Sequence, residues 1–240
     1  MSSITYDGHS FGDYVSAELA EPVAQVVAPE TAKVPGRPGR VLLSADVEPL
    51  ELKIRLFLDA PDVLTSAQRS EVRRTLRSWL LNTDGSVRKV PGEPDLEWRD
   101  VICAGVSDWS SLFSEGSATV TFLALDPIAY GRHLVSVMGR FRVTGGQPTW
   151  PEFLFVAEEG ATAVGVRDNV SGASLRIERV FSGGERVSVD CARQTVRLNG
   201  ADIASCLTLG SDFFQLVPGY ADLTFTGCSK HNTWFWERWA

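Results

Sequence analysis

The stretch Ala118-Thr119-Val120-Thr121-Phe122-Leu123-Ala124-Leu125-Asp126-Pro127-Ile128-Ala129-Tyr130-Gly131 decides how the fold is divided. Its first half places Val120, Phe122 and Ala124 on one face, with the period-2 alternation of a half-buried strand. Pro127 then removes a backbone donor and ends the strand. We therefore predict a domain boundary soon afterwards, with a first domain over residues 1–135 and a second over residues 136–240.

Two further strands are predicted in the first domain. Over residues 51–58 apolar side chains alternate with mostly charged ones, as in an antiparallel strand with one wet face. Its buried face would consist of Leu52, Ile54, Leu56 and Leu58. Residues 98–106 predict the other strand, and residues 109–116 a loop.

One long helix is predicted over residues 67–81, where apolar side chains recur at helical spacing. Thr65 followed by Gln68 offers a capping box at its start. Arginines occupy the other side, namely Arg69, Arg73, Arg74 and Arg77. These arginines would either form a solvated face of the helix or pair with acidic groups of a neighbouring subunit.

Residues 28–43 are rich in proline and contain two Gly-Arg pairs. Proline and glycine in this arrangement favour tight turns and disfavour a packed helix. We interpret the segment as an extended arm or hairpin. Its tip consists of Val34, Pro35, Gly36, Arg37, Pro38, Gly39 and Arg40.

The second half of the chain alternates short strands and turns, with no helical period. Strands are predicted over residues 174–178, 186–190, 195–198, 213–217, 222–226 and 233–239. Asn199-Gly200 between two of them is a strong hairpin signal. This regular spacing predicts an antiparallel β-sandwich or jelly roll, which makes the chain mainly β.

The charge of the chain argues against nucleic-acid binding. Residues 1–135 carry 13 basic and 19 acidic side chains and the remainder 10 and 11, so neither half attracts phosphate at long range. The first residues lack the basic and apolar regions of a signal peptide, and no apolar run approaches the ~20 residues of a membrane helix. We expect a soluble chain made in the cytoplasm, with no membrane partner.

No constellation of nucleophile, base or metal ligands is evident. The three histidines, His9, His133 and His231, lie outside any nucleophile elbow. Cys228 lies near His231, but no second pair of zinc ligands follows. The four cysteines are widely spaced, which predicts reduced, small apolar core residues.

The carboxylates around Pro94 are the remaining catalytic candidates. Glu93, Asp95 and Glu97 could in principle act as the acid pair of a glycosidase. On a predicted proline-rich loop we interpret them as solvated turn charges. We therefore predict no enzyme activity, no cofactor and no metal.

Segments in order along nearly the whole chain resemble the siphophage distal tail protein family. They are residues 4–8 with 11–14, 34–40, 98–106, 121–131, 171–172, 175–177, 189–191, 196–200, 211–219 and 237–239. The resemblance implies an N-terminal α+β ring-forming domain, an antiparallel sheet or split barrel with one main helix. A C-terminal galectin-like sandwich would follow it.

The resemblance also implies a role. Members of this family are structural virion proteins at the distal end of the phage tail, assembled in the host cytoplasm, without catalytic residues. The resemblance implies a homo-hexameric ring that joins the tail tube protein to the tail-tip hub protein and docks baseplate or receptor-binding proteins. The arm tip would then contact a neighbouring subunit, since each subunit of a cyclic ring offers two different patches.

The aromatic C-terminal segment supports a second hypothesis, a glycan-binding module for adhesion to the host surface. Trp234 and Trp236 would share one face of a strand, and Phe235 and Trp239 the other. One set would pack in the core, whereas the other could stack on sugars or dock a protein. The candidate docking or stacking aromatics are Trp234, Trp236 and Trp239.

Overall fold

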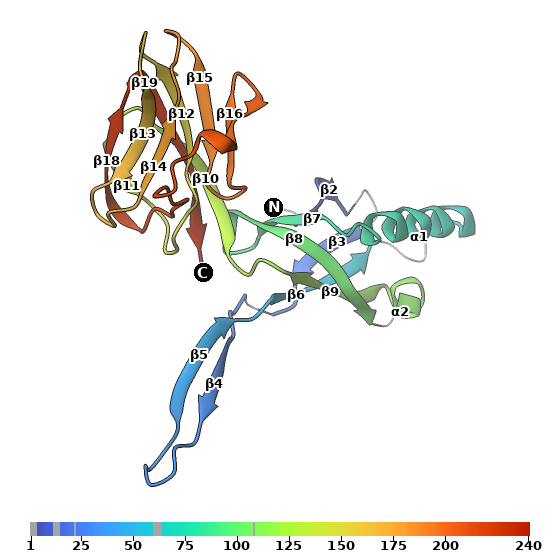
Figure 1. The fold of residues 1–240 in the computed structure, drawn as a ribbon. Coiled ribbons are helices and arrows are strands. Elements are labelled where there is room, and N and C mark those ends of the chain that lie inside the picture. The colour runs from blue at the N-terminus through green and yellow to red at the C-terminus, as the bar shows by residue number, and fades with distance from the viewer. Residues whose placement is uncertain (1–3, 12–14, 22, 60–63, 108) are drawn as a thin grey trace. The chain divides into compact units, whose positions relative to one another are not determined.

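The computed structural model describes residues 4–11, 15–21, 23–59, 64–107 and 109–240, and the chain folds into two compact units. Unit 1 comprises Met1–Tyr130 with Ala240, and unit 2 comprises Gly131–Trp239. The predicted boundary after residue 135 lies inside strand β10 (Ala129–Ser136). The predicted fold class is confirmed, because the chain is mostly antiparallel β-sheet with one main helix (Figure 1).

Unit 1 is built on one antiparallel sheet with the strand order β3-β6-β9-β8-β7-β1-β2. These strands are β1 (Thr5–Tyr6), β2 (His9–Ser10), β3 (Val15–Leu19), β6 (Leu50–Leu58), β7 (Gly85–Val90), β8 (Glu93–Ser107) and β9 (Ser117–Ala124). The four predicted core residues of β6 are all buried, namely Leu52, Ile54, Leu56 and Leu58. Strand β9 lies between β6 and β8 and ends at Ala124, just before Pro127.

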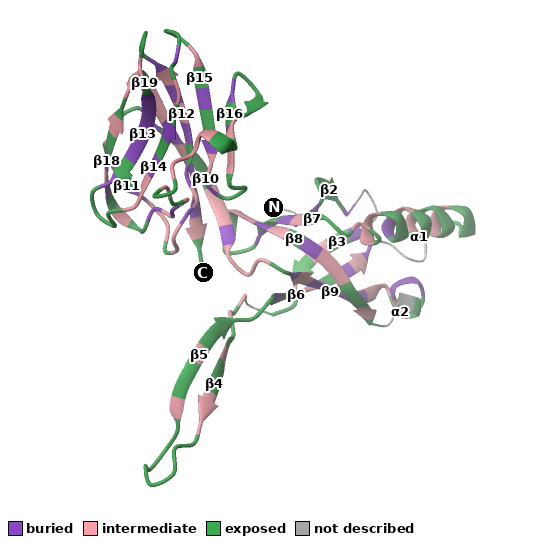
Figure 2. Cartoon of the chain, viewed as in Figure 1, coloured by how far each residue is buried: buried purple, intermediate pink, exposed green. Residues whose placement is uncertain are grey.

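Helix α1 (Ser66–Leu80) begins at the predicted capping box. The Thr65 hydroxyl accepts a hydrogen bond from the Gln68 N–H at 3.3 Å, and the Gln68 side chain accepts one from the Thr65 N–H at 2.9 Å. Leu76 is buried in the core of unit 1, with Val72, Trp79 and Leu80 packed against it. The helix is therefore attached to the sheet along one apolar stripe, and its opposite side is exposed (Figure 2).

Two predictions for unit 1 are wrong. The predicted loop over residues 109–116 contains the short helix α2 (Trp109–Ser114), which forms because Leu112 and Phe113 are buried in the core. A helix this short shows no full apolar period in its sequence. The predicted loop around Glu93, Asp95 and Glu97 instead opens strand β8. Pro94 is tolerated there because it stands at the beginning of the strand.

Unit 2 is a sandwich of two antiparallel sheets (Figure 1). One has the order β17-β16-β15-β12-β19-β10 and the other β11-β18-β13-β14. The further strands are β11 (Arg140–Val143), β12 (Glu152–Ala157), β13 (Ala163–Asp168), β14 (Ser174–Glu178), β15 (Arg186–Asp190), β16 (Thr195–Leu198), β17 (Ala201–Asp202), β18 (Gly219–Thr226) and β19 (Cys228–Trp239). Their inner faces bury one shared core rich in phenylalanine, including Phe153, Phe155, Phe214 and Phe235.

In unit 2 the predicted hairpin turn is confirmed, whereas one predicted strand is wrong. Asn199 and Gly200 have φ values of 48° and 92° and join β16 to β17, as the hairpin signal predicts. The predicted strand over residues 213–217 is wrong. Phe214 and Leu216 are buried and Val217 is 50 % exposed, but among the described residues the backbone of this segment pairs only through Leu216 with Thr149. The facing segment contains prolines on either side of Thr149, which cannot donate to a ladder.

The cysteine prediction holds only in part. All four thiols are free, but only Cys191 is fully buried, while Cys103, Cys206 and Cys228 are partly accessible. Burial raises the pKa of the Cys191 thiol to about 12. This thiol is therefore a packing group with almost no thiolate at neutral pH. A short 3-10 helix (Ala204–Cys206) lies between β17 and β18.

Candidate functional site

The predicted arm is a hairpin formed by β4 (Val27–Ala32) and β5 (Val41–Val47), which among the described strands pair only with each other. At its tip the Arg37 N–H donates to the Val34 carbonyl at 3.2 Å. Pro35 and Gly36 occupy the two central positions of this turn, and Gly36 has a φ of 80°. A type II turn requires this positive φ, which explains the Pro-Gly pair.

One face of this hairpin arm is apolar and uncovered. Cross-strand partners share a face, and the arm pairs Val27 with Val47 and Thr31 with Leu42. Leu43 is the extra residue of a β-bulge and is exposed beside Leu42. Figure 2 shows the hairpin as largely exposed. An isolated two-stranded hairpin is marginally stable in water, so this face is suited to a partner.

The tip of the arm is basic. It carries Arg37 and Arg40, and Lys33 lies next to it in the chain, all exposed. Arg40 donates from Nη2 to the Thr31 carbonyl at 3.0 Å and so braces the tip against β4. At the base of the arm, Gln25 donates from Nε2 to the Pro127 carbonyl at 2.7 Å. The arm is therefore anchored to the loop that follows β9.

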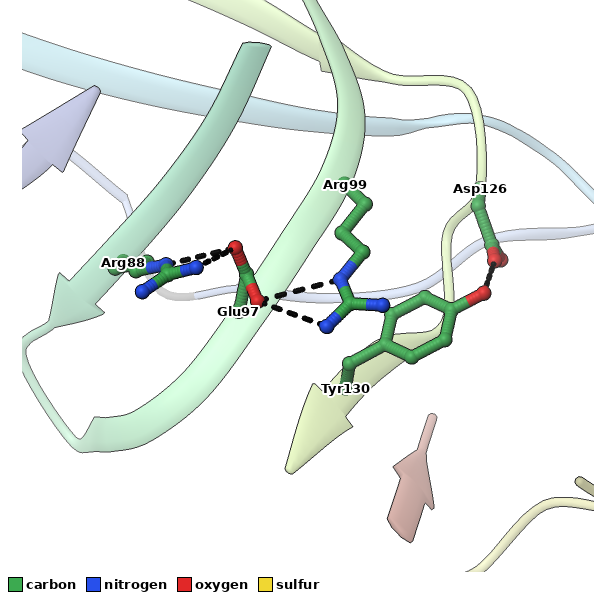
Figure 3. Close-up of polar contacts among 5 residues, drawn as sticks. All are labelled: Arg88, Glu97, Arg99, Asp126 and Tyr130. Carbon is green, nitrogen blue, oxygen red and sulfur yellow. Dashed lines mark hydrogen bonds and ion pairs between the residues drawn. The ribbon is translucent and has the colours of Figure 1, made fainter. Parts of the chain in front are cut away.

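A second site in unit 1 is a charged network around Glu97 (Figure 3). Arg88 donates from Nε to Glu97 Oε1 at 2.7 Å, and Arg99 donates to Oε2 at 3.1 and 3.2 Å. Burial alone would raise the pKa of Glu97, but the hydrogen bond from Arg88 and the charge of Arg99 outweigh it and leave this pKa lowered. Glu97 is therefore held as a carboxylate between two arginines.

The network continues from Arg99 to the end of unit 1 (Figure 3). The Arg99 guanidinium lies 4.3 Å from the centroid of the Tyr130 ring, in a cation–π contact. The Tyr130 hydroxyl donates to Asp126 Oδ2 at 2.8 Å, and Asp126 Oδ1 accepts from the Ile128 N–H at 3.0 Å. These contacts fix the loop that holds Pro127 and the start of β10.

The C-terminal aromatics are not brought together as one patch. Phe235 is buried and stacks on Phe141, as expected for a core residue, whereas Trp239 is 41 % exposed. Trp234 and Trp236 lie on the outer face of β19 and are partly buried, and Trp236 stacks on His133 at 4.4 Å between ring centroids. Phe235 and Trp239 are predicted to share a face, but Phe235 is buried in the core whereas Trp239 is exposed.

The residues that the structure describes contain no group of three or more potential metal ligands. The histidines pack against aromatic rings: His9 on Trp79, His133 on Trp236 and His231 on Phe225. Burial lowers the pKa of His231, which keeps it neutral at pH 7. Among the described helices, none is long and apolar enough to cross a membrane.

Part of the sequence signal falls outside what the structure describes. Gly12, Asp13 and Tyr14, which contribute to the family resemblance, lie outside the described residues. The network around Glu97 and Tyr130 is absent from the predicted sites. Glu97 and Arg99 are two positions apart, and residues at this spacing share one face of a strand. Because the sequence predicts a loop at residues 93–97, this spacing does not predict the contact.

Comparison with known sequences gives two matches. Residues 144–239 match the family described as siphovirus-type tail component, C-terminal domain. The distal tail protein of Bacillus phage SPP1 is 29 % identical over 108 residues, a segment that covers 42 % of this chain and 42 % of that protein. The aligned segment thus spans less than half the length of this relative.

Solved structures extend the likeness to the whole fold. The crystal structure of the SPP1 Dit protein, described as a paradigm of the hub adsorption apparatus in phages that infect Gram-positive bacteria, superposes with a TM-score of 0.82. That match has 20 % identity and covers 99 % of both chains. A chain of the phage p2 baseplate in its activated conformation with Sr superposes with a TM-score of 0.56 at 8 % identity, over 98 % of this chain and 97 % of that one.

The family match identifies the class of protein that residues 144–239 resemble, the siphovirus-type tail components. Within that class the SPP1 protein shares both a sequence segment and the fold over the full length of the chain. The chain is therefore similar to siphophage distal tail proteins, in sequence over part of its length and in fold over nearly all of it.

Proposed function

We propose that this protein is the structural adaptor at the distal end of a siphophage tail. Six copies form a closed ring that joins the tail tube protein to the tail-tip hub protein. The C-terminal sandwich, galectin-like in this proposal, docks baseplate or receptor-binding proteins. The particle is assembled in the host cytoplasm.

The observation that carries this proposal is the uncovered apolar face of the hairpin arm. Val27, Leu42, Leu43 and Val47 are all exposed on a hairpin that pairs with no other strand in the described part of the chain. A two-stranded hairpin of this kind gains stability when its apolar face is buried. In a cyclic ring, each subunit can lay this arm on a different patch of the next one. The similarity to siphophage distal tail proteins supplies the tail context.

The assembly state of the full chain tests the proposal. We expect native mass spectrometry and electron microscopy to show six-fold rings of the wild-type protein. The variant L42D/L43D places two carboxylates on the apolar face, and burying unpaired charge should weaken assembly by about tenfold or more. The matched control L209D changes an exposed leucine of unit 2 and should assemble normally.

Two outcomes would overturn the proposal. One is a wild-type chain that stays monomeric and also fails to assemble with the tube and hub proteins of its phage. The other is an L42D/L43D variant that forms rings as readily as the L209D control.

Glycan binding is the second candidate function. It is favoured by the partly exposed Trp234 and Trp236 and by the exposed Trp239. Tryptophan suits this role because its apolar ring can stack on a sugar while its polar N–H stays in contact with water. A glycan array tests it with the wild type and with W239A. Reproducible binding that W239A abolishes would support this function, and an array without signal would exclude it for the glycans displayed.

A further inference from the structure

The outer face of the sheet β11-β18-β13-β14 in unit 2 is polar and rich in arginine. Alternate residues of these strands point into the core, including Val164, Val166, Leu175 and Leu223, which are all buried. The intervening side chains therefore point outward. We define the arginine face by the outward residues Arg140, Arg142, Arg167, Tyr220, Asp222 and Thr224.

The three arginines of this face form no ion pair within the described part of the chain. The ion pairs of unit 2 are Arg132 with Glu237, Arg176 with Glu178, and Arg193 with Asp190. Arg140, Arg142 and Arg167 are exposed and take part in no ion pair among the described residues. Their guanidinium groups are thus available to a partner.

The strand register places these groups close together. Arg142 lies opposite Tyr220, and Arg140 lies opposite Asp222, across the β11–β18 pair. Arg167 lies opposite Thr224 across the β13–β18 pair. Adjacent strands are about 4.8 Å apart and a strand rises about 3.3 Å per residue, so the arginines border β18 on both sides, about 10 Å apart across it and within about 13 Å along it. Tyr220 is 72 % exposed on that strand.

We propose that the arginine face is a docking surface for an acidic segment of another tail-tip protein. Guanidinium groups bind carboxylates through paired hydrogen bonds, and arginine and tyrosine supply much of the binding energy of protein interfaces. Residues 136–240 carry 10 basic and 11 acidic side chains, so the positive charge of this face is local and suits a short acidic segment better than a long phosphodiester chain. A protein segment of mixed charge can also offer Asp222 a basic side chain.

This inference rests on the proposed function, because the partner is another component of the assembled tail. The test uses phage tails assembled with the full chain, in which a photo-crosslinking benzoylphenylalanine replaces the exposed Tyr220. Irradiated tails are analysed by mass spectrometry for adducts. The same label is combined with R142E/R167E or with R186E/R197E, a matched control on the outer face of the other sheet.

We expect an adduct with an acidic stretch of another tail protein. Its yield should fall about tenfold or more in R142E/R167E, because like charges across an interface cost several kcal/mol, and stay near wild type in R186E/R197E. Four results would overturn the inference: an adduct with cell-wall polymer, an adduct with a second copy of this chain, equal yields in both double variants, or no adduct in complete tails. If the labelled chain and the wild type are both absent from purified tails, the proposed function itself fails.

Discussion

Tyr130 donates its phenolic hydroxyl to the Asp126 carboxylate at 2.8 Å, across the loop that contains Pro127. The ring of the same tyrosine lies beneath the Arg99 guanidinium, which in turn binds Glu97. One side chain therefore connects the loop after β9 to strand β8. This explains why an aspartate, a proline and a tyrosine occur together there: the aspartate orders the turn, the proline ends the strand, and the tyrosine ties both to the sheet.

Removing the Tyr130 hydroxyl should destabilise unit 1. In Y130F the Asp126 carboxylate loses a hydrogen-bond donor, while the aromatic ring still contacts Arg99. We expect a loss of about 1.5–3 kcal/mol in the free energy of unfolding, the usual range for a hydrogen bond to a charged acceptor. Urea unfolding followed by fluorescence measures it. Y220F, which removes an exposed hydroxyl, is the control, and equal losses in the two variants would contradict this account.

The stability of unit 2 should depend on the ionisation of Glu237. The hydrogen bond from Arg132 lowers the pKa of Glu237 to about 2, and burial only partly opposes this effect. A lowered pKa in the folded state stabilises the protein above the ordinary glutamate pKa of 4.5, and this stabilisation is lost as the pH falls from there towards about 2. Arg132 is 72 % exposed, so water screens the pair and we expect a contribution of about 2 kcal/mol at pH 7.

Unfolding of the wild type and E237Q between pH 7 and pH 2.5 checks this contribution. E237Q should be less stable at pH 7, and the difference should shrink as the medium becomes acidic. E178Q is the matched control, because Glu178 pairs with Arg176 on the exposed surface, where such a pair contributes about 0–1 kcal/mol. A difference between E237Q and wild type that does not change with pH would argue against the assigned pKa.

The apolar stripe of α1 can be tested with two leucines of the same segment. Leu76 is 1 % exposed and Leu81 is 79 % exposed. L76A leaves a cavity in the core of unit 1 and should cost about 3 kcal/mol of unfolding free energy. L81A should cost less than about 0.5 kcal/mol, as expected at an exposed position. Thermal and urea unfolding distinguish these values, and similar costs would mean that α1 does not pack through Leu76.

The capping box of α1 should act as a unit. T65A removes the acceptor for the Gln68 N–H and should cost about 1 kcal/mol. Q68A removes the reciprocal bond to the Thr65 N–H. Because the two bonds share both residues, the double variant should cost less than the sum of the single variants. A double-mutant cycle by urea unfolding measures this coupling, and strict additivity would show that the two bonds are independent.

The elements that the sequence predicts well are those with a long, regular pattern. Strand β6 shows five alternating apolar positions, and α1 combines a helical stripe with a capping signal, so local physics alone defines both. Helix α2 is too short to show a period and forms because the core buries Leu112 and Phe113. The segment around Phe214 and Leu216 has the pattern of a strand, but its ladder depends on a facing segment that contains two prolines.

The candidate sites show the same division. The arm is predictable because Pro35 and Gly36 supply the dihedral angles of its turn, whereas the bulge at Leu43 carries no sequence signal and depends on pairing. Contacts between distant residues, such as Tyr130 with Arg99, require the register of strands that lie far apart in the sequence. Trp239 shares the parity of Phe235 but lies at the end of β19, where the core no longer covers it.

The two-stranded form of the arm has a consequence for how rings would be completed. A hairpin that is marginal alone recovers its ordering cost only where a neighbour receives it. In the proposed ring, an open arc of subunits leaves one arm at one end and one receiving surface at the other unfilled, whereas a closed circle leaves neither. Each incomplete arc therefore retains the free-energy cost of ordering one arm that no neighbour receives, and only ring closure removes this cost. The low stability of the isolated arm thus favours closed rings over open fragments.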